Sequence, residues 1–499
     1  MANSLKKLVG QTAIYGLSSI IGRFLNYLLV PLYTYKIAAA SGGYGVVTNI
    51  YAFTALLLVL LTFGMETTFF YFANRDEVDS KKAFSTAASA VGIVSLVFWL
   101  LCMIFSVPIA NTLNYEAHPE YIRIMASVVA LDAFQAILFA QLRNQNRALK
   151  FVILKLAFII CNVGLNLFIF LVAPHLSESC PSLMGWYDSS YQVGYVFLVN
   201  LICTAGVTLG FLPELRDMRF GIDTKLLKEM LKYTWPLLLL GLIGILNQVA
   251  DKICYKFIVP GQEGEVQLGI YGACVKIAMI IAIFTQAFRY AYEPFVFGGQ
   301  KDKNSREMQA EVMKYYVMFT LLAFLLVVLY LDVFKFIIQR NYWEGLRSIP
   351  IVMMAEIFMG VYFNLSFWYK LNKQTWWGAI FSTIGVAALL AINFIFVPKY
   401  GYMACAWGGF AGYGICMLLS YIVGQKKNPI PYNLKAILGY FALAVIIYYL
   451  SKLLRPHNQI LVYVVNTALL LVYVAALVYN ERVLVKKVFS GVRGKLLKR

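Results

Sequence analysis

Charged residues stand inside long apolar segments of this chain, where a charge is costly and therefore informative. The segment that begins near Leu268 ends in FRYAYEPF, in which Arg289 and Glu293 lie four residues apart. Residues at this spacing share one face of a helix and can pair. We expect either an ion pair that locks a helical bundle or a gate at the cytoplasmic end of a cavity, with Glu66 as the first-half counterpart of Glu293.

The first apolar segment carries a polar stripe that includes an arginine. Tyr15, Ser19, Arg23 and Asn26 recur at helical spacing. A charge at the centre of a membrane helix costs roughly 2.5–3.5 kcal/mol, so it is expected to face a bundle interior or a watery cavity. Arg23 is therefore predicted to line a functional cavity, and a structural ion pair is the alternative.

A second group of charges lies in the seventh apolar segment. Gln248, Lys252 and Lys256 form a row at i, i+4 and i+8, and Asp251 lies beside this row. We expect Lys252 either to line the cavity or to serve a structural role. Lys256 lies nearer the end of the segment and is expected to snorkel outward.

Three further charges lie outside these groups. Asp132 and Glu356 are single acids in the fourth and tenth segments. Each is interpreted as a carrier of a proton or sodium ion, with a hydrogen-bonded buried acid as the alternative. Lys276 lies about 140° from Arg289 around an ideal helix, so it is not expected to share the stripe of Arg289.

The cationic candidates favour an anionic passenger. Arg23, Lys252 and Arg289 are predicted to bind substrate, because cations along a bundle interior suit a phosphate or pyrophosphate better than a cationic drug. The acids Glu66, Glu293, Asp251, Asp132 and Glu356 are predicted to act in gating or ion coupling. The eight cysteines and three histidines are scattered, so neither a disulfide framework nor a metal site is expected.

The segments that hold these charges indicate a polytopic membrane protein. Of 499 residues, 61% are hydrophobic and 13% are charged, whereas soluble domains carry about 25% charged residues. A span needs roughly 20 apolar residues, and the chain offers about 14 such segments. The expected spans are 12–36, 46–72, 84–110, 120–142, 151–173, 190–212, 233–259, 268–297, 312–331, 348–369, 375–397, 402–423, 435–451 and 459–480.

The net charge of +19 follows the loops. Most Lys and Arg residues lie in the even-numbered connections and at the two ends of the chain, which is the positive-inside pattern. Both termini are therefore expected in the cytoplasm. Since the charge is explained by membrane topology, nucleic acid is not an expected partner.

An internal repeat relates the two halves of the chain. An offset of 227 residues pairs Tyr44-Gly45 with Tyr271-Gly272 and Glu66 with Glu293, and a local shift to 229 pairs Arg23 with Lys252. The offset carries the first span onto the seventh in the same orientation, which predicts two parallel six-helix bundles around a central site. The predicted domains are a first bundle over 1–220, a second over 221–425, and two appended helices with a basic cytoplasmic tail over 426–499.

Four stretches together resemble a known family. They are GRFLNYLLVPLYT (22–34), YGVVTNIYAF (44–53), LLTFGMETTFFYF (60–72) and AFRYAYEPFVF (287–297). They resemble the polysaccharide-exporter branch of the multidrug/oligosaccharidyl-lipid/polysaccharide superfamily and, within it, the bacterial O-antigen and capsule repeat-unit flippases. Related peptidoglycan-precursor flippases use arginines in the central cavity; Arg23 best matches that role, and Arg289 is the second match.

The resemblance implies an all-α, two-lobed transporter of the bacterial inner membrane that works by alternating access. Its passenger would be an undecaprenyl-pyrophosphate-linked oligosaccharide used in lipopolysaccharide or capsule biosynthesis, moved from the cytoplasmic to the outer leaflet. No P-loop pattern is present, so we expect no cofactor and instead coupling to a proton or sodium gradient. The expected partners are membrane lipids, the lipid-linked glycan and glycan-assembly proteins, and the expected state is a monomer.

Two other function classes are weighed against this interpretation. A cation-coupled drug or small-molecule antiporter of the same superfamily is the alternative transporter. A membrane enzyme is disfavoured, because the longest outer connection, 173–189, has no Lys or Arg and no paired acids. We therefore expect a transporter and not an enzyme.

Overall fold

The part of the chain that the structure describes is built from helices. The computed structural model describes residues 27–482, except 183, 217–220, 299–304 and 373, and no strand occurs among these residues. The predicted all-α class is therefore confirmed. The greater part of the first expected span, including Arg23, lies outside the described residues.

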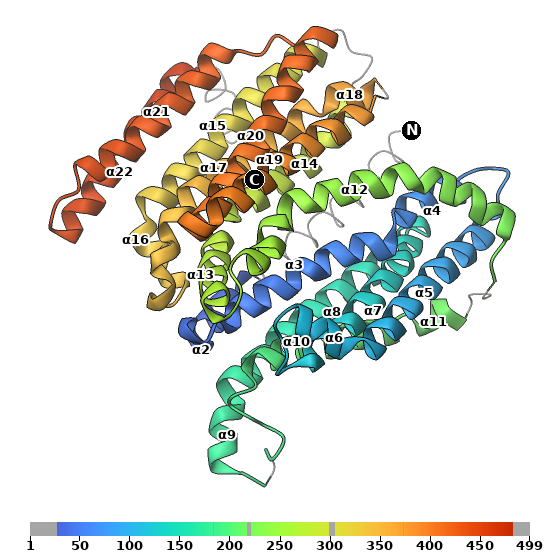
Figure 1. Cartoon of the computed structure of the whole chain (residues 1–499). Helices are drawn as coiled ribbons and strands as arrows, with labels where there is room; N and C mark the ends of the chain where they lie inside the picture. The colour runs from blue at the N-terminus through green and yellow to red at the C-terminus, as the bar shows by residue number, and fades with distance from the viewer. Residues whose placement is uncertain (1–26, 183, 217–220, 299–304, 373, 483–499) are drawn as a thin grey trace, which may run out of the picture.

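The first half contains ten described α-helices (Figure 1). They are α2 (Leu29–Lys36), α3 (Gly43–Thr62), α4 (Met65–Ala73), α5 (Ser80–Ile104), α6 (Ser106–Thr112), α7 (Pro119–Asn144), α8 (Ala148–Leu167), α9 (Ala173–Ser179), α10 (Gln192–Leu209) and α11 (Leu212–Arg216).

The second half contains eleven described α-helices and a short 3-10 segment over Arg340–Ser348 that precedes α17. The helices are α12 (Thr224–Ile258), α13 (Gln262–Ala278), α14 (Ile280–Gly298), α15 (Ser305–Leu329), α16 (Leu331–Phe334), α17 (Ile349–Leu365), α18 (Phe367–Leu371), α19 (Trp376–Tyr400), α20 (Tyr402–Lys427), α21 (Leu434–Leu453) and α22 (Gln459–Asn480).

The membrane-length helices agree with the expected spans. Among the described residues, 12 helices are long and apolar enough to cross a membrane, or 13 if the bent pair α13–α14 counts as one span. Each expected span after the first has a counterpart in this set. The chain is therefore a multi-pass membrane protein, and the expectation of about 14 spans is confirmed.

Two interruptions of helical structure set the directions of the helices that border the site. Between α3 and α4, Phe63 and Gly64 both adopt left-handed backbone angles, with φ of 34° and 74°. Such angles are uncommon for a residue with a Cβ, so the turn ends α3 and starts α4 in a new direction. Between α13 and α14 the axis bends by 43° next to Met279.

Helix α12 connects the two halves of the molecule. Its first turn is capped by Asp223, whose carboxylate accepts hydrogen bonds from the backbone N–H groups of Lys225 and Leu226 at 3.0 and 3.1 Å. The helix packs against α3, α4 and α5 of the first half and against α19 and α20 of the second half. It therefore lies between the two groups of helices (Figure 1).

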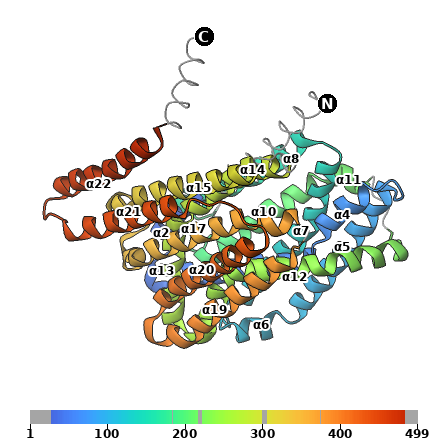
Figure 2. The same ribbon diagram turned by 90° about the horizontal axis from the view of Figure 1, so that it is seen from above.

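The two halves repeat the same helix neighbours. Helix α7 packs against α3, α5 and α10, and α17 packs against α13, α15 and α20. This correspondence is what the repeat predicts, although the exact domain boundaries stay a prediction. Helices α21 and α22 lie beyond α15 at one edge, outside both groups (Figure 2).

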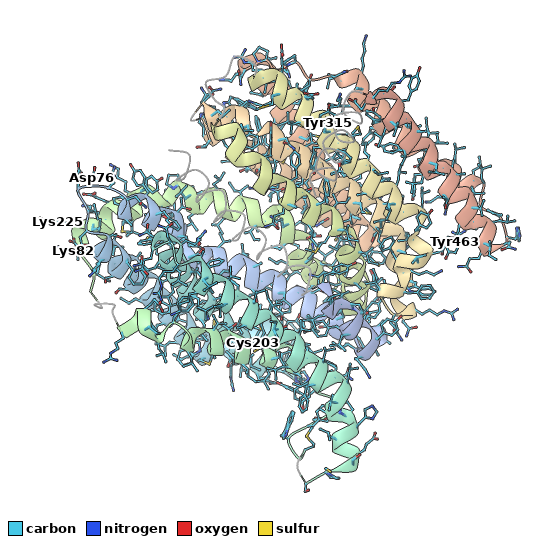
Figure 3. All side chains as sticks on the ribbon, turned by 180° about the vertical axis from the view of Figure 1, so that it is seen from behind. Asp76, Lys82, Cys203, Lys225, Tyr315 and Tyr463 are labelled. Atoms are coloured by element: carbon cyan, nitrogen blue, oxygen red, sulfur yellow. The ribbon has the colours of Figure 1, made fainter. Side chains whose placement is uncertain are left out.

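Charged residues of the first half lie close to the start of α12 (Figure 3). Asp76 and Lys82, from the loop after α4 and the start of α5, lie near Lys225 at the start of α12 (Figure 3). Helices α3 and α4 run from the opposite end toward these residues. The positive-inside orientation of these connections stays a prediction.

Candidate functional site

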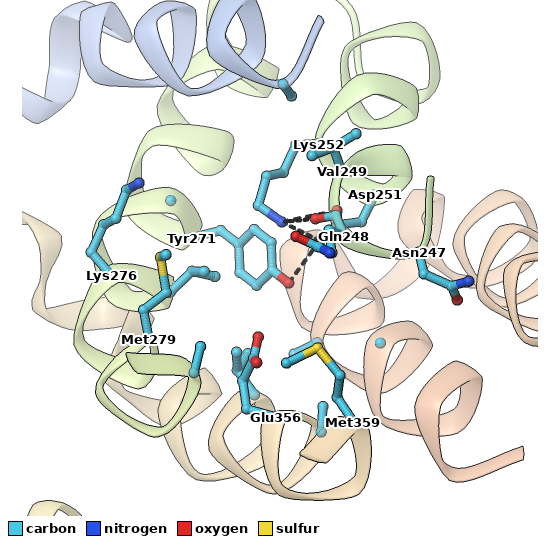
Figure 4. A pocket seen from close by; sticks show the side chains of 18 of the residues that line it. Asn247, Gln248, Val249, Asp251, Lys252, Tyr271, Lys276, Met279, Glu356 and Met359 are labelled. Atoms are coloured by element: carbon cyan, nitrogen blue, oxygen red, sulfur yellow. Dashed lines mark hydrogen bonds and ion pairs between the residues drawn. The ribbon is translucent and has the colours of Figure 1, made fainter. Parts of the chain in front are cut away.

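One cavity brings together four of the eight predicted site residues. It has a volume of about 380 Å³ and lies between α3 of the first half and α12, α13, α14, α17, α19 and α20 of the second half. Its charged lining residues are Asp251, Lys252, Lys276, Arg289 and Glu356 (Figure 4). We call this space the central cavity.

Lys252 and Asp251 form an ion pair on the wall of the central cavity. The Lys252 Nζ lies 3.0 Å from Asp251 Oδ1 and also donates to the Gln248 carbonyl oxygen at 3.0 Å. The Tyr271 hydroxyl donates to Asp251 Oδ2 at 2.9 Å. Because the Asp251 side chain is only 7% exposed, these two donors compensate its buried charge.

Lys276 lines the same cavity as Arg289, which corrects the expectation from the ideal helix. The 43° bend next to Met279 separates the two residues into α13 and α14, so the 100° step per residue does not continue from one to the other. In the described part of the chain, no acidic side chain pairs with the Lys276 amine. Lys276 thus supplies a cation that a ligand can use.

Arg289 and Glu356 face the central cavity from α14 and α17. The Arg289 guanidinium lies over the Phe363 ring, with Cζ 4.1 Å from the ring centroid. This contact orients the planar group by a cation–π interaction. The side chain of Glu293 lies outside the described residues, so the expected Arg289–Glu293 pair stays a prediction.

Glu66 and Asp132 lie away from the central cavity, in a second cavity of about 370 Å³. This first-half cavity is bounded by α4, α7, α8 and α10, and it also contains Arg143 and Lys155. The Arg143 Nη2 donates to Glu66 Oε2 at 2.9 Å. The acids predicted to act in gating or ion coupling are therefore divided between two cavities, as far as their side chains are described.

Lys256 does not snorkel outward, and that expectation is wrong. Its side chain is 2% exposed, and Nζ donates to Glu265 Oε1 at 2.8 Å while lying over the Tyr115 ring. The reason is the tight turn after α12, which brings the first turns of α13 back alongside its last turns. Glu265 thereby neutralises the ammonium in place.

A seam of small residues closes one end of the interface between the halves. A Cβ placed on Gly45 would lie within bonding distance of the Glu265 backbone, and one on Gly272 would strike Thr48. Helices α3 and α13 therefore approach as closely as only glycine permits. We call this contact of α3 with α13 the glycine seam.

Two hydrogen bonds reinforce the glycine seam. The Tyr342 hydroxyl donates to the Ile37 carbonyl oxygen at 2.9 Å, and the Gln262 amide donates to the Ala40 carbonyl oxygen at 3.0 Å. Each bond joins the second half of the chain to the first. These bonds and the glycine seam hold the two halves together at this end in the conformation seen here.

The chain is similar to a known protein family over more than half of its length. A family model described as polysaccharide biosynthesis protein matches residues 8–291. A comparison with curated protein sequences finds no significant match.

Solved structures of transporters have the same fold. A lipid II flippase MurJ, in an inward closed conformation, aligns with a TM-score of 0.70 and 14% identity over 93% of this chain and 98% of that chain. An inward-facing multidrug resistance MATE transporter of the MOP superfamily aligns at 0.62 and 14% identity over 81% and 94%. A MATE transporter of Vibrio cholerae aligns at 0.55 and 11% identity over 86% and 99%. At these identities the likeness shows the fold alone.

Proposed function

The chain belongs to the polysaccharide biosynthesis protein family, and from this premise we propose that it is a flippase for an undecaprenyl-pyrophosphate-linked oligosaccharide. It would move the lipid-linked repeat unit from the cytoplasmic to the outer leaflet of the bacterial inner membrane by alternating access. The observation that carries this proposal is the convergence of Lys252, Lys276 and Arg289 on one cavity between the halves.

The chemistry of the central cavity supports an anionic head group. Three cationic side chains share the space with two acids, and one acid, Asp251, already has the Lys252 ammonium and the Tyr271 hydroxyl as partners. A pyrophosphate offers oxygens that an ammonium and a guanidinium bind through charge-assisted hydrogen bonds. We propose Lys276 as the primary contact, because no acidic side chain of the described residues pairs with it. The Arg289 guanidinium would exchange its present contacts for the passenger, and Lys252 would exchange between Asp251 and the passenger.

The two ends of the bundle would open one after the other. With the basic loops in the cytoplasm, the glycine seam lies on the outer side and is closed in this conformation. The head group would enter from the cytoplasmic side, while the prenyl tail stays in lipid between helices. Separation of α3 from α13 at the seam would then expose the head group to the outside.

We also propose a driving force, an oligomeric state and a topology. An ion gradient of protons or sodium would supply direction, and no cofactor is proposed. The chain would act as a monomer with both termini in the cytoplasm, in contact with glycan-assembly proteins, as a transporter and not as an enzyme. Arg23 of the first bundle, which lies outside the described residues, would bind the same head group.

A cation-coupled antiporter of drugs or small molecules is the second candidate. Asp251 and Glu356 line the central cavity and are the groups that such a cation would need. The ion pair between Asp251 and Lys252 disfavours this candidate, because the carboxylate is already compensated.

Binding of defined lipids to the purified full-length chain tests the proposal. We expect undecaprenyl diphosphate to bind more tightly than undecaprenol, and the double variant Lys276→Ala/Arg289→Ala to lose most of this difference. Lys399→Met, which removes a cation of α19 outside the central cavity, is the matched control. Equal binding of the two lipids, or preferential binding of a lipophilic cation such as ethidium, would contradict the flippase.

A further inference from the structure

The first-half cavity contains an acidic residue, Asp132, that has no part in the proposed head-group binding. Glu66 is neutralised by Arg143 at 2.9 Å. Asp132 and Lys155 line the same cavity, from α7 and α8, without a direct ion pair between them. The Lys155 Nζ instead lies over the Phe139 ring, 4.0 Å from its centroid. Asp132 is thus an acid inside the bundle with a counter-charge across a cavity.

A row of polar side chains runs from Asp132 to the central cavity. The Thr204 hydroxyl of α10 lies beside the Asp132 carboxylate and donates to Asn200 Oδ1 at 3.4 Å. The Asn200 amide donates to the Tyr51 hydroxyl at 3.0 Å. Tyr51, on α3, lines the central cavity. The two cavities are therefore joined by side chains of α7, α10 and α3.

The bonds around this row hold α10 against α7. The Gln135 amide donates to the Thr204 carbonyl oxygen at 2.8 Å and to the Thr208 hydroxyl at 2.7 Å. A shift of α7 would therefore move Thr204, and with it Asn200 and Tyr51. A change of charge at Asp132 has a direct structural route to the wall of the central cavity.

We infer that Asp132 is the residue that carries the coupling proton, with Lys155 as its counter-charge. When ionised, the carboxylate attracts the Lys155 ammonium across the cavity and draws α8 toward α7. A proton taken from cavity water neutralises the carboxylate and ends this attraction, and release returns the proton to water. This inference rests on the proposed transport function and names its driving ion and carrier.

The mouth of the first-half cavity is open to the surroundings of the bundle. The side chains of Glu66 and Arg143, which line it, are 41% and 36% exposed. The groups that face Asp132 from the packed helices are few. They are Lys155 of α8, Glu66 of α4, Arg143 of α7, Tyr51 of α3 and Thr204 of α10. Helix α5 carries charges only at Lys81 and Lys82, in its first turn.

Infrared difference spectroscopy of the full-length protein tests the inference without any substrate. As the pH falls, we expect a carbonyl stretch of a buried protonated carboxyl to appear in the wild type and to be lost in Asp132→Asn. Asp332→Asn is the matched control, because Asp332 lies between Lys335 and Arg455, and it should keep the band. A band that persists in Asp132→Asn, or no such band in the wild type, would overturn the assignment.

Lys155→Met tests the counter-charge separately. Without the ammonium, the Asp132 carboxylate loses its compensation, so the band should persist to higher pH than in the wild type. An unchanged midpoint would refute the role of Lys155. Because these measurements need no lipid, a failure of undecaprenyl diphosphate to bind would count against the flippase alone, and a missing band against the proton carrier alone.

Discussion

The Lys252 ammonium and the Asp251 carboxylate are neighbours in sequence and form an ion pair 3.0 Å long on the wall of the central cavity. Consecutive residues of a helix point in directions about 100° apart, so such a pair forms only when a long side chain bends back. Lys252, one of the three cavity cations, is thus already bound to a carboxylate. The pair therefore distinguishes Lys252, which an acid compensates, from Lys276, which pairs with no acidic side chain among the described residues.

Single substitutions of the cavity cations should differ in effect. Lys276→Met removes a cation that pairs with no acidic side chain among the described residues, so we expect roughly 10- to 100-fold weaker binding of undecaprenyl diphosphate, equivalent to about 1.5–3 kcal/mol. Lys252→Met should cost less, because its ammonium must first leave Asp251. Binding titrations of the purified protein measure both. An equal loss in Lys399→Met would show that general charge, and not the cavity, determines affinity.

Asp251→Asn should strengthen binding of the same lipid. Asparagine keeps an oxygen that accepts from the Tyr271 hydroxyl but no longer holds the Lys252 ammonium by charge. We expect roughly tenfold tighter binding, or about 1.4 kcal/mol, together with slower release. Binding kinetics in detergent measure both quantities. Weaker binding in Asp251→Asn would mean that the carboxylate itself contacts the passenger.

Gly45→Ala should open the glycine seam. A methyl group at this position collides with the Glu265 backbone, and overpacking of this kind costs about 1–3 kcal/mol. The readout is a bis-maleimide cross-link between Ala40→Cys and Gln262→Cys, in a chain whose exposed Cys161 and Cys180 are serine.

The seam cross-link should form readily in the wild-type background and fall several-fold in Gly45→Ala. Gly164→Ala is the control, because a Cβ at Gly164 meets nothing within 4 Å. A similar fall in both alanine variants, or in neither, would disprove the close approach of α3 and α13 as the closing contact.

Lys256→Met should destabilise the protein more than the double variant Lys256→Met/Glu265→Gln. Removing one partner of a buried pair leaves the other uncompensated and costs about 3–5 kcal/mol, whereas removing both restores most of this loss. Thermal unfolding in one detergent compares the variants. If the double variant unfolds below the single one, Lys256 stabilises through the Tyr115 ring and not through Glu265.

The helices could be predicted from the sequence because apolar length alone determines a membrane span. Part of the lining of the central cavity could also be predicted, because buried charges must face an interior. The residues predicted in this way are Lys252, Asp251, Arg289 and Glu356. Lys276 could not be placed, since no motif in the sequence marks the bend next to Met279.

The remaining differences arise from contacts between helices that are far apart in sequence. The sequence does not single out Arg143 and Lys155, although both line the first-half cavity with Glu66 and Asp132. Lys256 was misjudged because its partner lies beyond the next turn. Periodicity within one helix gives the face on which a charge lies, but not the residue that it meets.

The most direct measurement determines which leaflet holds the labelled lipid-linked oligosaccharides in a strain that lacks this gene. The account predicts accumulation in the inner leaflet with loss of surface glycan, reversed by the wild-type chain and by Lys399→Met but not by Lys276→Ala/Arg289→Ala produced at the same level in the membrane. Normal delivery to the outer leaflet in the strain without the gene would contradict it.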